Sequence, residues 1–136
     1  MAAFYHRHGA CEGTLVVPYQ EPAPSPEPAR LRLVIIESPL AGDVEANTAY
    51  ARRCMLDCLR RNEAPYASHL LFPQVLDDLV PAERALGIEA GLAWGAKADA
   101  TVVYTDRGIS NGMRMGIARA ERAGRPVEMR TLGGVE

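Results

Sequence analysis

Residues 99–124, DATVVYTDRGISNGMRMGIARAERAG, decide the fold. The segment 99–106 is apolar, rich in β-branched residues and closed by a polar turn, which predicts a buried strand. Residues 109–124 predict a helix that stops at Gly124, because glycine is the usual residue just past a helix C-terminus. A strand that turns through glycines into a helix is the repeating unit of a parallel α/β sheet.

The same alternation of strand and helix extends outward from this stretch. In the first helix, Asp43 or a neighbour can cap the start and Pro65 ends the element. Pro81 suits the first turn of the next helix. The order βαβαβαβ predicts an α/β fold, a Rossmann-like three-layer domain with a parallel β-sheet of about four to five strands. The other elements are expected at 31–39 (strand), 42–65 (helix), 64–78 (a short strand running into a long loop), 81–98 (helix) and 125–132 (strand).

Apolar residues at helical spacing predict which helix faces are buried. Cys54 and Cys58 lie four residues apart, and we expect them to be buried thiols rather than metal ligands or a disulfide. Trp94 is expected in the core rather than stacked on a base. The apolar stripe of the first helix comprises Ala51, Cys54, Met55, Cys58 and Leu59, and that of the second comprises Leu86, Ile88, Leu92 and Trp94.

The first 30 residues differ from the rest of the chain. Residues 18–30, PYQEPAPSPEPAR, are proline-rich and favour extended backbone, which predicts a linker. We therefore expect an N-terminal arm and linker over 1–30 and an α/β domain over 31–136. Within the arm, residues 13–19 (GTLVVPY) predict a strand that pairs with a sheet edge of its own body or of a neighbouring subunit.

Composition limits the functional class. The chain has 136 residues, 48% of them hydrophobic and 24% charged, and its net charge is −2. This charge provides no basic field, so nucleic acid is not an expected partner. No apolar run approaches the roughly 20 residues of a membrane helix, and the N-terminus lacks the apolar stretch of a signal peptide. We expect a cytoplasmic protein with no membrane partner.

Ligands of parallel α/β sheets bind beyond the carboxyl ends of the strands. Here those positions are Glu37 to Asp43, Ser68 to Asp78 and Thr105 to Gly112. At the last of them, free N–H groups at a helix N-terminus favour a phosphate or a sugar hydroxyl, and Arg107 adds charge; an ordinary capped helix is the alternative. The candidate ligand-binding residues are Ser38, Pro39, Gly42, Asp43, Gln74, Asp106, Gly108, Ser110, Asn111, Gly112, Met113 and Arg114.

Four side chains at these strand ends are candidates for catalysis. Glu37 ends an apolar strand, where a carboxylate can bind ribose or act as an acid or base, or can simply be solvated. His69 is a candidate acid or base, or a residue that holds its loop by hydrogen bonds. Asp77 and Asp78 are candidate carboxylates, and Asp78 can instead cap the helix that follows. No metal site is expected.

Four separated stretches resemble a known group of proteins: SPLAGDVEANTAYARRC, ASHLLFPQVLDD, PAERALGIEAGLAW and GISNGMRMGIARAERAGRPVEMR. Over residues 32–131 the chain resembles small uncharacterised bacterial and phage proteins with DUF4406 and DUF7768 domains. These are similar in fold to nucleoside 2-deoxyribosyltransferases and nucleotide N-glycosidases. The resemblance implies a small-molecule nucleoside or nucleotide at the carboxyl edge, no cofactor, and a homo-oligomer.

One departure from those enzymes bears on catalysis. They carry a nucleophilic glutamate on the first turn of the helix after a late strand. Arg114 or Met115 takes that place here, and Gly116 stands where many nearer relatives have an acid. Glu37, Asp77, Asp78 or Glu83 could supply the missing carboxylate, and so could a neighbouring subunit. The sequence therefore leaves three alternatives: an enzyme acting on an N-glycosidic bond, a non-catalytic nucleotide-binding sensor or sequestering protein, and a structural oligomerisation module.

Overall fold

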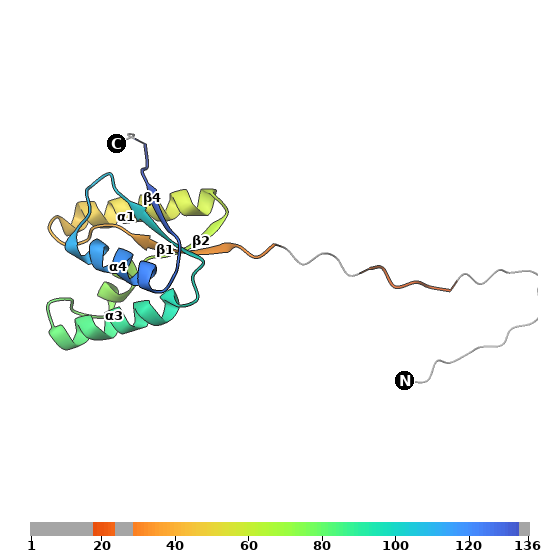
Figure 1. Cartoon of the computed structure of the whole chain (residues 1–136), viewed down its shortest axis with the longest axis horizontal. Coiled ribbons are helices and arrows are strands. Elements are labelled where there is room, and N and C mark those ends of the chain that lie inside the picture. Colours follow the sequence, from red (N-terminus) through yellow and green to blue (C-terminus); the bar gives the residue numbers. More distant parts are fainter. Residues whose placement is uncertain (1–17, 24–28, 134–136) are drawn as a thin grey trace, which may run out of the picture.

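The computed structural model describes residues 18–23 and 29–133 (Figure 1). Helices and strands alternate along the body, as the sequence predicts. The elements are β1 (Arg32–Glu37), α1 (Val44–Arg60), β2 (Glu63–Tyr66), α2 (Ser68–Leu71), the 3-10 helix η1 (Phe72–Gln74), α3 (Pro81–Gly95), β3 (Ala100–Tyr104), α4 (Asn111–Arg122) and β4 (Val127–Arg130).

The four strands form one parallel sheet in the order β2-β1-β3-β4. Alternate residues of a strand point to opposite faces, so β1 shows which helices cover which face. Val34 and Ile36 pack with α1, whereas Ile35 and Glu37 lie against Gly95 of α3 and Gly116 of α4. The sheet is therefore sandwiched between α1 on one face and α3 and α4 on the other (Figure 1). This confirms the predicted three-layer α/β fold.

The main hydrophobic core lies between α1 and the sheet. Asp43 caps α1 by accepting a hydrogen bond from the Ala46 N–H (3.1 Å), and Asn62, with φ 58°, follows its last turn. Cys54 and Cys58 are 0% exposed free thiols, which confirms their expected burial. Leu59 is 54% exposed, so its place in the predicted stripe is wrong. One residue beyond Cys58, it is rotated about 100° around the helix, toward solvent.

Four charged residues form an ion-pair network at the α1 face of the sheet. Arg130 of β4 bonds both carboxylate oxygens of Glu63 of β2 (2.7 and 2.8 Å) and one of Glu128 (2.7 Å). Arg32 of β1 bonds both glutamates. The Arg130 and Glu63 side chains are only 10% and 7% exposed. The network thus ties together the two edges of the sheet and a central strand.

The other face of the sheet is covered differently. Gly87, Gly91 and Gly95, spaced four apart, form the inner face of α3, where added Cβ atoms would lie 3.4 Å from Leu76, 3.2 Å from Ser68 and 3.0 Å from Ile35. Small residues let α3 approach closely but bury little side chain. The expectation that Leu86, Leu92 and Trp94 join the core is wrong, because they lie beside the glycine face and are 57%, 45% and 63% exposed. The Trp94 ring lies at the edge of the core, 6.0 Å from the ring of Tyr66.

Two further predictions concern loops and termini. Residues 68–78 are not a long loop, because α2 and η1 occupy most of them. The strand expected at 13–19 falls outside the described residues except for Pro18 and Tyr19, which belong to neither a helix nor a strand. The boundary between arm and domain at residue 30 stays a prediction. None of the described helices is long and apolar enough to cross a membrane.

Candidate functional site

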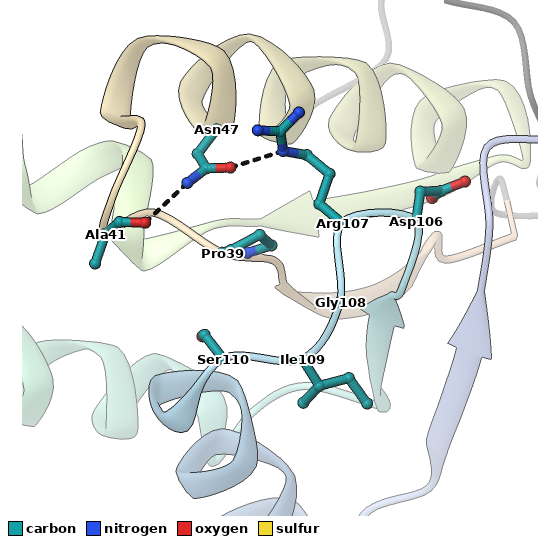
Figure 2. A pocket seen from close by; sticks show the side chains of 8 residues that line it. All are labelled: Pro39, Ala41, Asn47, Asp106, Arg107, Gly108, Ile109 and Ser110. Atoms are coloured by element: carbon teal, nitrogen blue, oxygen red, sulfur yellow. Dashed lines mark hydrogen bonds between the residues drawn. The ribbon is translucent and has the colours of Figure 1, made fainter.

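An open cleft of about 590 Å³ lies at the carboxyl edge of the sheet. It separates the loop after β1 from the loop after β3 (Figure 2). These two central strands lead to helices on opposite faces, so the cleft sits at the switch point where such sheets bind ligands. Its lining residues are Pro39, Ala41, Asn47, Asp106, Arg107, Gly108, Ile109 and Ser110.

Asn47, in the first turn of α1, holds one wall of the cleft. Its side-chain N–H groups donate to the carbonyls of Leu40 (3.1 Å) and Ala41 (3.0 Å), which fixes the loop after β1. Its side-chain oxygen accepts a hydrogen bond from Nε of Arg107 (2.8 Å), which ties this wall to the opposite one (Figure 2). Gly42, at φ 93°, makes the turn before α1 in a conformation that disfavours other residues.

The opposite wall is the loop between β3 and α4. Asp106 accepts hydrogen bonds from the Tyr50 hydroxyl (2.5 Å) and from the Leu132 N–H (3.1 Å). Its carboxylate therefore anchors the loop to α1 and to the segment after β4. Gly108, at φ 78° with nothing within 4 Å of an added Cβ, turns the chain toward α4.

The N-terminus of α4 faces this loop. The Ser110 side chain caps the helix by accepting from the Met113 N–H (3.3 Å). The first N–H groups of a helix have no acceptor within it, so Asn111 and Gly112 offer two donors to a ligand. Met113 is 2% exposed and packs in the interior. Arg114 is exposed and borders a separate hollow along α4, lined also by Met115, Ala118, Arg119 and Arg122.

Glu37, at the tip of β1, places a carboxyl group against α4. A Cβ atom built on Gly116 would lie 2.0 Å from Glu37 Oε1 and 2.8 Å from Oε2, so only glycine leaves room for this carboxyl at residue 116. No hydrogen-bond partner for the Glu37 side chain exists among the described residues. Burial raises the pKa of Glu37 to about 7, although Arg119 and Arg125 oppose the shift. The group is thus close to half protonated at neutral pH.

The residue after Glu37 contacts the candidate histidine. Ser38, which is 5% exposed, and His69 of α2 lie 2.7 Å apart, from Oγ to Nε2. Burial lowers the pKa of His69 to about 4, so its imidazole is neutral at physiological pH. Ser38 and His69 are therefore brought together, whereas the Glu37 side chain lies against α4. None of the three lines the cleft, which begins at Pro39.

Three candidate residues lie away from this group. Asp78 forms an exposed ion pair with Arg84 (2.8 Å), and Asp77 accepts from the Leu79 N–H (2.9 Å) in the turn before α3. Gln74 is exposed and donates to the Leu70 carbonyl (3.0 Å). All three make contacts within the connection between α2 and α3. The short helices α2 and η1 hold this segment away from the cleft. None of them lines it.

The sequence did not single out every residue of the cleft. Asn47 was missed, Ala41 and Ile109 lie in the expected loops but were not named as candidates, and Arg107 was noted only as a source of charge. Asn47 carried one usable signal, since a polar residue sits there three positions before the buried Tyr50, on the same side of the helix. Ala41 and Ile109 act through backbone position and carry no such signal. Within the described residues, no cluster of three or more His, Cys, Asp or Glu could hold a metal ion.

Comparison with known proteins supports the fold and the family. A family model described as a domain of unknown function, DUF7768, matches residues 32–130. The 2-deoxyribosyltransferase from the psychrotolerant bacterium Bacillus psychrosaccharolyticus has a similar structure, with a TM-score of 0.56, 14% sequence identity and 76% of each chain covered. At this identity the likeness concerns the fold alone. No curated protein matches the chain in sequence.

Proposed function

The chain belongs to the DUF7768 family, and we propose that it binds a nucleotide in the cleft between the β1–α1 and β3–α4 loops. The observation that carries the proposal is the position of this cleft, which joins the sheet's switch point to the N-terminus of α4. Its volume of about 590 Å³ is within the ordinary range of small-molecule sites. The fold shared with a 2-deoxyribosyltransferase supports a nucleoside-containing ligand.

The groups left available in the cleft favour an anionic ligand. Asp106 and Asn47 both have their polar atoms engaged by the protein itself. The groups with no bond to the described protein are donors: the Ser110 hydroxyl hydrogen and the terminal nitrogens of Arg107 in the cleft, and the N–H groups of Asn111 and Gly112 beside it. Donors at a helix N-terminus bind phosphate. We therefore propose a nucleotide rather than an uncharged nucleoside, with its phosphate on α4.

Binding measurements test this directly. Isothermal titration calorimetry of the purified chain with ribo- and deoxyribonucleoside monophosphates, each beside its parent nucleoside, should show at least about tenfold tighter binding of the nucleotide. Inorganic phosphate should compete weakly for the same site. Equal affinity for nucleotide and nucleoside would remove the phosphate from the proposal. No heat with any member of either series would contradict nucleotide binding itself.

A second candidate function is cleavage of the N-glycosidic bond, and the Glu37 carboxyl favours it. A group with a pKa of about 7 can donate a proton at neutral pH. In the proposed step, Glu37 protonates a nitrogen of the base while the bond from C1′ to the base breaks. The electron pair of that bond stays on the base, and water adds to C1′ and releases a proton. Free base and a sugar phosphate are the products.

Proton NMR of nucleotides incubated with the protein distinguishes a glycosidase from a binder. An enzyme converts the anomeric proton signal of the nucleotide to that of the free sugar phosphate, and Glu37→Gln abolishes the conversion while leaving nucleotide binding in place. A matched control, Glu121→Gln on the exposed last turn of α4, should retain full turnover. Binding without turnover in the unchanged protein would leave a sensor or sequestering protein as the function.

A further inference from the structure

A second hollow, of about 340 Å³, lies along the outer side of α4. Its lining contains three arginines and no acidic residue: Arg114, Met115, Ala118, Arg119 and Arg122. None of these arginines forms a hydrogen bond or an ion pair with any residue that the structure describes. Guanidinium groups that gather around a hollow without a protein partner favour a ligand that carries several negative charges.

The hollow continues the nucleotide cleft along α4. Residues that are four apart on a helix form one row on its surface. One such row begins at Ser110, which lines the cleft at the start of α4 (Figure 2), and continues into the hollow with Arg114. The adjacent row begins at Asn111, whose N–H group is a donor for the phosphate, and continues with Met115 and Arg119. Both rows therefore lead from the proposed phosphate site to the arginines.

The stability of the helix does not account for Arg114. Cations stabilise the C-terminal end of a helix, which suits Arg119 and Arg122 in the last turn of α4. Arg114 lies near the N-terminal end, where the helix dipole disfavours a cation, and the first turn of α4 contains no acidic side chain to offset it. The electropositive end of the helix thus carries an additional positive charge, which an anionic ligand would stabilise.

We propose, as an inference that rests on the proposed function, that the ligand is a nucleoside polyphosphate rather than a monophosphate. The first phosphate lies on the N–H groups of Asn111 and Gly112, the second contacts Arg114, and the third phosphate of a triphosphate approaches Arg119. Helix geometry supports this order, because helical side chains lean back toward the N-terminus. At a rise of about 1.5 Å per residue, Arg114 lies about 4.5 Å along the axis from Asn111 and Arg119 about 12 Å. Arg122, about 16 Å along the axis, is beyond the reach of a triphosphate.

Isothermal titration calorimetry without divalent cations, using the mono-, di- and triphosphate of the same nucleoside, tests the number of phosphates. The triphosphate should bind at least about tenfold tighter than the monophosphate, since it adds charge-assisted hydrogen bonds to arginine. Arg114→Gln should remove most of this gain and change the affinity for the monophosphate less than about twofold. Arg119→Gln should weaken binding of the triphosphate alone. The control Arg122→Gln should leave all three affinities in place.

Inorganic tripolyphosphate separates this inference from nucleotide binding itself. It should bind at least about tenfold tighter than orthophosphate, and Arg114→Gln should abolish the difference. Equal affinities for the mono- and triphosphate nucleotides would overturn the inference and leave nucleotide binding in place, and so would an equal loss of both in Arg114→Gln. Tripolyphosphate binding through Arg114 without binding of any nucleotide would support the polyphosphate site and overturn the proposed function. Binding of neither would overturn both.

Discussion

The two faces of the sheet are built on opposite principles. On the α1 face, Tyr50, Cys54 and Cys58 are at most 2% exposed, and the ion-pair network at Arg130 joins the sheet edges. On the α3–α4 face, glycines make the α3 contacts, the large apolar side chains of α3 stay largely exposed, and Glu37 has no hydrogen-bond partner in the described residues. Stability is concentrated on the first face. The second holds a buried acid, so substitutions on the two faces should have different consequences.

The largest effect is expected on the α1 face, at Arg130. Arg130→Ala leaves Glu63, which is 7% exposed, with Arg32 as its remaining ion-pair partner, and should lower the free energy of unfolding by about 3 kcal/mol, the lower end for a broken buried pair. Urea denaturation measures the change. The control Arg61→Ala breaks only the ion pair with Asp57, in which Arg61 is 51% exposed, and should cost no more than about 0.5 kcal/mol. Equal losses in the two variants would show that the network does not stabilise this face.

The α3–α4 face should respond to pH through two groups with opposite signs. The pKa of Glu37 is raised from 4.5 to about 7, so its contribution to stability is complete below pH 4.5 and is lost as pH rises to 7. The pKa of His69 is lowered from 6.5 to about 4, so its contribution is complete above pH 6.5 and is lost as pH falls to 4. The two trends partly cancel in the unchanged protein.

Single variants should uncover each trend. In Glu37→Gln, the free energy of unfolding should fall by about 2–3 kcal/mol between pH 6.5 and 4, since the His69 term then acts alone. In His69→Gln, it should fall by a similar amount as pH rises from 4.5 to 7. Urea denaturation at half-unit pH intervals gives both curves. Two parallel curves would mean that neither group is buried as the structure describes.

Much of this fold follows from sequence, and so do the two loops that form the cleft, but the contacts that hold the cleft do not. Residues 99–124 predict β3, the turn and α4 because β-branched spacing and glycine punctuation are local properties. The exposure of Trp94 could not be predicted, because it depends on three glycines acting together as the packing face of α3. Glu37 was a candidate by position, but its contact with Gly116 joins residues 79 apart in the chain. Asn47 and Asp106 act through long-range hydrogen bonds, which no local pattern indicates.

A smaller and more specific effect is expected where Glu37 meets α4. Gly116→Ala should lower the free energy of unfolding by about 1–3 kcal/mol, because the new Cβ would lie 2.0 Å from Glu37 Oε1. In a Glu37→Ala background the same change should instead stabilise the protein by up to about 1 kcal/mol, as alanine normally does in a helix. Urea denaturation of all four proteins gives the coupling. If Gly116→Ala has the same effect in both backgrounds, the carboxyl does not occupy this space.

The smallest predicted effect concerns the cleft. Arg107→Gln removes one charge beside α4 and should weaken nucleotide binding about fivefold without changing the affinity for the parent nucleoside. The exposed Arg122, which lies outside the cleft at the other end of α4, supplies the control Arg122→Gln. Isothermal titration calorimetry measures both variants. A loss of the same size at Arg122 would indicate a general charge effect rather than a contact in the cleft.

The most direct test of nucleotide binding is a two-dimensional ¹H–¹⁵N NMR titration of the labelled chain with a nucleoside monophosphate. The amide signals of Gly108, Asn111 and Gly112 should shift most, with downfield changes at Asn111 and Gly112 as their N–H groups donate to phosphate. Signals of α1 beyond its first turn should stay in place. Shifts confined to the hollow along α4, at Arg114, Met115 and Ala118, would contradict binding in the cleft, and so would a spectrum that the nucleotide leaves unchanged.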